Sequence, residues 1–155
     1  MVMADIVKVS KERGLQKISR YFEFLGFYLE KELFGVPLRE VVEISKLLPI
    51  VPVPFSSPLI LGVINVRGEI LPVIDLKTIL RLRKEKEEER VVLVESPKGK
   101  VGILVDEVVG VVRIEEEKLE PNPMVGRYSE FVRNVAQLPY GLISILEFDR
   151  IVESV

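Results

Sequence analysis

Short apolar runs separated by turn residues dominate the chain from Tyr21 onward. The first two runs, 21–29 and 33–37, enclose the charged segment Glu30–Glu32 and predict a β-hairpin. Further strand-like runs follow at 62–65, 69–74, 91–95, 100–105, 108–114 and 142–148. About ten short strands with little helix predict an all-β fold made of small barrels.

Three other segments have different patterns. Residues 38–44 fit either a strand or one helical turn, because the run is too short to decide between them. Four prolines in 48–58 predict an extended loop. Asp75 is placed to cap a short helix over 76–82, and a second short helix is predicted over 149–155.

The chain divides around a run of mixed charges at 81–90, which we interpret as a solvated connection. Residues 1–18 mix charged and apolar side chains and predict an N-terminal arm, either loose or a short helix. The remainder, 19–155, then forms one domain with barrel regions at about 19–84 and 90–155. Neither region has enough residues for a large core of its own.

The amino-acid composition excludes several classes of function. The 155 residues include no cysteine and no histidine, which excludes disulfides, thiolate metal sites and the commonest general base. We therefore predict no metal and no cofactor. The formal net charge of -2 offers no basic face for nucleic acid.

The termini and apolar runs predict a cytoplasmic protein. The first residues lack a basic-then-apolar signal pattern, and runs such as 47–51 and 91–94 are too short to span a bilayer. Glu, Lys and Arg are abundant while Asn and Gln are scarce, which is typical of a thermophilic source.

The run 62–76 places one arginine at a turn between two apolar strands. Gly68 permits a positive backbone angle there, and Arg67 offers a planar fork of five N–H donors at the strand end. From spacing alone, Arg67 is either an exposed turn residue or pairs with a carboxylate or with the carbonyls of a partner.

This run resembles the first signature of the CheW family of chemotaxis adaptor proteins. The positions that match are Asn65, Arg67, Gly68, Pro72, Val73, Asp75 and Leu76. A second block, 102–114, resembles the second signature and contains the Val105-Asp106 pair. A third block joins 34–37 to 41–44, and the resemblance extends from about Tyr21 to Ile151.

The resemblance implies two interleaved five-stranded β-barrel subdomains with short helices, and no catalysis. It implies a scaffold that couples chemoreceptors to a CheA-type histidine kinase. One partner would be the regulatory domain of that kinase, which has the same fold. The other would be the cytoplasmic helical-hairpin tip of a methyl-accepting chemotaxis receptor.

The resemblance also implies an apolar receptor-binding groove between the barrels. Its residues would be Leu25, Leu38, Val41, Ile44, Val108 and Val111, with Glu43 and Arg67 at the polar border. The resemblance assigns structural roles to five signature residues, Asn65, Gly68, Pro72, Asp75 and Asp106. Taken singly, each aliphatic residue fits plain core packing better, and only the matched blocks favour a groove.

Two alternatives come from the residues themselves. A small barrel that binds single-stranded nucleic acid needs basic and aromatic side chains on one face, whereas the aromatics here cluster in 21–34. An enzyme would have to use Asp75 and Asp106, which fit caps and turns better. The segment 121–139 matches the family poorly, and Arg133 stands where the family often has glycine.

Overall fold

The computed structural model describes residues 5–12, 15–54, 56–122 and 129–155, and most of them lie in strands. The strands are β1 Asp5–Glu12, β2 Leu15–Leu29, β3 Glu32–Pro37, β4 Val41–Lys46, β5 Ile60–Val66, β6 Glu69–Ile74, β7 Arg90–Ser96, β8 Gly99–Val105, β9 Glu107–Glu115, β10 Glu120–Pro121, β11 Val132–Leu138 and β12 Gly141–Leu146. The helices are α1 Leu76–Ile79, α2 Phe148–Glu153 and the 3-10 turns η1 Leu38–Glu40, η2 Glu116–Lys118 and η3 Ser129–Phe131.

The strands form two sheets. In the larger sheet the order is β1-β2-β3-β12-β11-β10, and β9 pairs with the edge of β2 opposite β3. The smaller sheet has the order β4-β7-β8-β6-β5. Each sheet takes strands from both sides of the charged stretch 81–90, so the predicted all-β fold with interleaved five-stranded subdomains is confirmed. Strands β1 and β10 add to the five that make up the larger subdomain.

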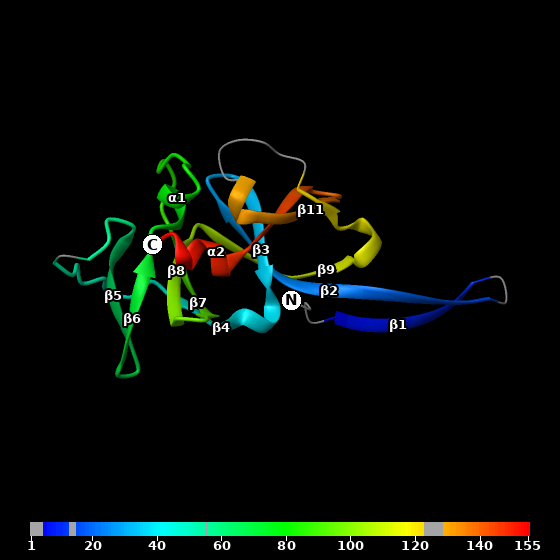
Figure 1. The fold of residues 1–155 in the computed structure, drawn as a ribbon, viewed down its shortest axis with the longest axis horizontal. Helices are drawn as coiled ribbons and strands as arrows, with labels where there is room; N and C mark the ends of the chain where they lie inside the picture. The colour runs from blue at the N-terminus through cyan, green and yellow to red at the C-terminus, as the bar shows by residue number, and fades with distance from the viewer. Residues whose placement is uncertain (1–4, 13–14, 55, 123–128) are drawn as a thin grey trace.

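One apolar core joins the two sheets. It contains Phe27 and Phe34 from the larger sheet, Val92 and Ile103 from the smaller sheet, and Phe148 from α2. In Figure 1, α2 lies between the two sheets, and it contacts β7 of the smaller sheet. A shared core is the expected solution for two subdomains that are each too small to bury enough surface alone.

The N-terminal segment corrects a prediction. Residues 5–12 form β1 and pair in antiparallel register with residues 15–22 of β2, so the segment is a hairpin and not a helix. Figure 1 shows this hairpin projecting from the body of the molecule. The two strands are held together by backbone pairing between β1 and the 15-residue strand β2. The local pattern of charged residues does not reveal this pairing.

Other local predictions have mixed outcomes. Residues 38–44 contain both predicted structures, because η1 is followed directly by β4. Helix α1 ends at Ile79, earlier than predicted, and Arg81 adopts a φ of 58°. Strand β11 lies inside the poorly matching segment and was not predicted. The charged stretch is mostly exposed, as predicted, although Leu82 is buried.

Candidate partner-binding surface

The β5–β6 turn presents Arg67 in a fixed position. Arg67 and Gly68 have φ values of 49° and 88°, and the Val66–Glu69 pair closes the two-residue turn. Positive φ at both central residues is the pattern of a type I′ hairpin turn. The Asn65 side-chain oxygen accepts a hydrogen bond from the Gly68 N–H at 2.7 Å. The Asn65 side chain thus closes the turn that presents Arg67, and Gly68 adopts the positive φ that this turn requires.

Arg67 forms a two-point ion pair with Glu43. Its Nη1 lies 3.1 Å from Glu43 Oε2, and its Nη2 donates to Glu43 Oε1. The guanidinium lowers the pKa of the Glu43 carboxyl, and the carboxylate raises the pKa of Arg67. Arg67 therefore has its carboxylate partner within this chain, while 75% of its side chain stays exposed.

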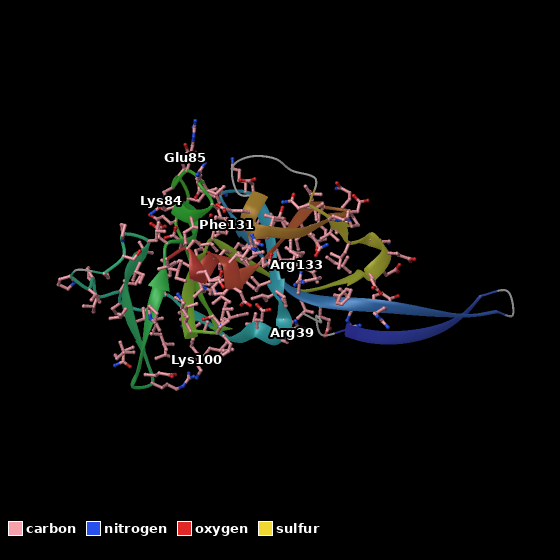
Figure 2. All side chains as sticks on the ribbon, in the orientation of Figure 1. Arg39, Lys84, Glu85, Lys100, Phe131 and Arg133 are labelled. Carbon is pink, nitrogen blue, oxygen red and sulfur yellow. The ribbon has the colours of Figure 1, made fainter. Side chains whose placement is uncertain are left out.

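The Arg67–Glu43 pair also shows how the smaller sheet is curved. Glu43 lies on β4, at one edge of the sheet, and Arg67 lies in the turn that leaves β5, the strand at the other edge. A sheet can bring its two ends together only by curling towards a barrel. A second pair, Lys100 to Glu69 at 3.2 Å, joins β8 to β6, and Figure 2 labels Lys100 towards the lower end of this sheet.

Three of the predicted aliphatic residues are half-buried at the margin of the shared core. Leu38 from η1, Val41 from β4 and Val108 from β9 each pack against it while remaining partly exposed. We call these three residues the apolar surface. Ile44 and Val111 are more exposed, at 41% and 57%.

Leu25 does not line this surface. It is 2% exposed and belongs to the shared core. Its face of β2 is covered by the shared core, and its pairing partners in the sheet are Val36 of β3 and Val111 of β9. This corrects the expectation that Leu25 contacts a receptor, and leaves it a supporting role in the core.

Val42 was missed by the sequence reasoning. It is as exposed as Ile44 and lies at a β-bulge, between Val41 and Glu43.

The two aspartates proposed as an enzyme alternative have structural partners. Asp75 caps α1, where its side chain accepts from the Thr78 N–H at 3.3 Å and from Lys84 Nζ at 2.5 Å. Asp106 accepts from the Glu30 N–H at 2.7 Å and pairs with Lys77 Nζ at 2.7 Å. Pro72 lies in β6 opposite Val63 of β5.

Comparison with known proteins identifies the family. The model of the CheW-like domain matches residues 23–155. The chain belongs to the CheW family. A chemotaxis protein CheW from Thermotoga maritima is 30% identical over 86% of this chain and 89% of its own length. The protein FrzA of Myxococcus xanthus is 29% identical, with 85% and 86% covered.

A solved structure agrees with this assignment. The scaffolding protein TtCheW from Thermoanaerobacter tengcongensis is 34% identical and superposes with a TM-score of 0.74, over 81% of this chain and 88% of that one. The CheW-family chain is therefore a chemotaxis scaffold and not an enzyme. Family membership does not favour the nucleic-acid alternative.

A buried charge cluster in this CheW-family chain was also missed. Lys77 is 3% exposed, and its Nζ lies 2.5 Å from Glu30, 2.7 Å from Asp106 and 3.0 Å from Glu88. We call these four residues the Lys77 cluster. A lysine in a short, exposed-looking helix is normally solvated, so the sequence carried no signal of its burial.

The cluster shifts the pKa values of its members. Burial of the Glu30 carboxyl raises its pKa, but hydrogen bonds from Lys77 and from the Lys86 and Glu85 N–H groups outweigh this and lower the pKa to about 2. Burial likewise disfavours the charged form of Lys77, yet hydrogen bonds to Asp106, Glu30 and Glu88 raise its pKa. Glu30 and Lys77 are therefore both charged at neutral pH.

The described part of the chain offers neither a metal-binding cluster nor a membrane-spanning helix. Within it, no group of three or more His, Cys, Asp or Glu side chains is arranged to hold a metal ion. Among the helices of the same residues, none has the length and apolar character to cross a membrane.

Proposed function

We propose that this chain acts in the cytoplasm and couples the helical tip of a methyl-accepting chemotaxis receptor to the regulatory domain of a CheA-type histidine kinase. The observation that supports it best is the apolar surface. Leu38, Val41 and Val108 come from three elements and stay half-exposed where both sheets contribute to one core. An amphipathic helix can lay its apolar face against branched aliphatics of this kind.

The exposed residues around the apolar surface extend it. Ile44 and Val111 supply further aliphatic contact area, and the Arg67–Glu43 pair supplies a polar border. Arg67 uses two guanidinium nitrogens on Glu43, which leaves other N–H donors for a carboxylate or carbonyl of the receptor. Replacing Arg67 would also leave Glu43 without its ion-pair partner. A Glu43 variant is therefore the control for any binding defect measured in an Arg67 variant.

The experiment is titration calorimetry of the purified chain against two partners in turn, a kinase regulatory domain and a receptor-tip hairpin. Transient signalling interfaces of this kind have dissociation constants on the order of micromolar. We expect binding of both partners in that range, and no binding of single-stranded DNA at low salt. Absence of heat, together with absence of a complex on a sizing column, would refute the proposal for the partner concerned.

A pair of variants locates the receptor site. Ile44→Ser removes an exposed aliphatic from β4, the strand that also carries Val41, and Tyr140→Ser removes a comparably exposed side chain at the β11–β12 turn. Both positions are solvent-exposed, so both variants should remain folded. We expect only Ile44→Ser to weaken receptor binding, and equal effects of the two substitutions would contradict the assignment.

A further inference from the structure

The Lys77 cluster gathers segments that are distant in the chain. Lys77 lies in α1, Glu30 in the β2–β3 turn, Glu88 just before β7, and Asp106 between β8 and β9. We propose that Lys77 is a positioning residue that holds the passage from β8 to β9 and thereby sets the place of Val108 for receptor binding. This inference rests on the proposed function, and Lys77 itself, being buried, would not contact the receptor.

Asp106 is the link between the cluster and the apolar surface. It is the single residue between β8 of the smaller sheet and β9 of the larger sheet. One of its carboxylate oxygens lies 2.7 Å from Lys77 Nζ, and the other accepts from the Glu30 N–H at 2.7 Å. Its own N–H donates to the Tyr28 carbonyl at 3.0 Å. Val108 follows two residues later, so its position depends on how Asp106 is held.

Lys77 also anchors the charged stretch 81–90 to the Lys77 cluster. Its Nζ donates to the Lys86 carbonyl at 2.9 Å, and the Glu30 carboxylate accepts from the N–H groups of Glu85 and Lys86, each at 2.8 Å. Figure 2 labels Glu85 on the loop beyond α1, together with Lys84. Because Glu30 binds both Lys77 and this loop, the ammonium group stands at the centre of one connected network.

Charge explains why removing Lys77 would move Asp106. Without the ammonium, the carboxylates of Glu30, Asp106 and Glu88 would face one another with no cation between them. Glu88 is 27% exposed and can turn towards water, whereas Asp106 is 6% exposed and cannot be hydrated without a backbone shift. A shift of the Asp106 backbone would displace the start of β9 and with it Val108.

The test compares Lys77→Met, which keeps the aliphatic stem and removes the charge, with Lys77→Arg, which keeps the charge. Lys100→Met is the matched control, since Lys100 forms an exposed ion pair in the smaller sheet. Melting curves first set a temperature at which all variants are folded. Receptor-tip affinity is then measured by calorimetry, and amide hydrogen exchange is measured in the free proteins.

We expect Lys77→Met to weaken receptor-tip binding by roughly 2- to 30-fold, the range for substitutions that act on binding through an intervening element. Lys77→Arg should recover most of the affinity, and Lys100→Met should leave it unchanged. In the free protein, the amides at 106–109 should lose protection in Lys77→Met while those of β5 and β6 keep theirs. A merely structural role would lower protection evenly through the fold.

Two results would overturn the inference: unchanged exchange at 106–109 in Lys77→Met, or receptor affinity equal to that of the parent. If Lys77→Met does not fold, the nearly isosteric Asp106→Asn carries the same test. If the unmodified chain itself fails to bind the receptor tip, the proposed function fails. The exchange data would then still decide whether Lys77 positions β9.

Discussion

Replacing Val108 with aspartate separates a residue that contacts a partner from one that only fills the core. Val108 pairs with Phe27 at the start of β9 and is partly exposed at the margin of the shared core. An aspartate there places a charge on the apolar surface, which an amphipathic helix could bury only at a large cost.

The expected loss of stability is moderate. Burying a valine completely contributes about 1.5–3 kcal/mol, so losing the partly buried Val108 should cost about 1–2 kcal/mol. The new carboxylate can remain hydrated, and a domain with about 5–15 kcal/mol of stability should stay folded. Leu25→Asp is the contrasting variant, because an unpaired carboxylate at a 2% exposed position costs several kcal/mol and should unfold the chain.

The assay has two parts, urea denaturation for stability and receptor-stimulated kinase activity for coupling. Val108→Asp should denature within about 2 kcal/mol of the parent and lose most of the stimulation. Val108→Thr keeps the side-chain shape without a charge and should retain more activity, which controls for repulsion from Asp106 and Glu107. If Val108→Asp unfolds as readily as Leu25→Asp, Val108 is a core residue. If it folds and stimulates normally, it contacts no receptor.

Three further predictions concern the Arg67–Glu43 pair, Glu30 of the Lys77 cluster, and the close backbone approach at Gly62 of β5. Arg67→Glu should fold but couple poorly, and adding Glu43→Arg should restore the ion pair with reversed polarity; melting curves and kinase stimulation check both. Because the folded-state pKa of Glu30 is about 2, its contribution to stability is complete above pH 4.5 and is lost as the pH falls towards 2. The stability difference between the parent and Glu30→Gln should therefore shrink from pH 5 to pH 2 in urea titrations, and a constant difference would contradict the assignment. Gly62→Ala would place its Cβ 2.4 Å from the Val51 carbonyl oxygen and should cost about 1–3 kcal/mol in urea denaturation, whereas Gly102→Ala, with contacts no closer than 3.4 Å, should cost less.

The sequence by itself determined the local features of this protein. Alternating and continuous apolar runs predicted most strands, the prolines predicted the loop after β4, and Asp75 predicted the cap of α1. Gly68 marked the turn that presents Arg67. These predictions succeed because turn geometry, capping and the period of a strand depend on neighbouring residues only.

The features that decide the site come from the tertiary structure. Leu25 is buried because the core shared by the two sheets covers its face of β2, and Glu43 meets Arg67 because the smaller sheet curls. Lys77 is buried because Glu30, 47 residues away, and Asp106 reach it from other elements. A pattern of apolar and polar residues specifies which face of a strand is covered, but not which distant segment covers it. Which segments contact each other depends on the packing of the whole chain, so only the folded structure shows these contacts.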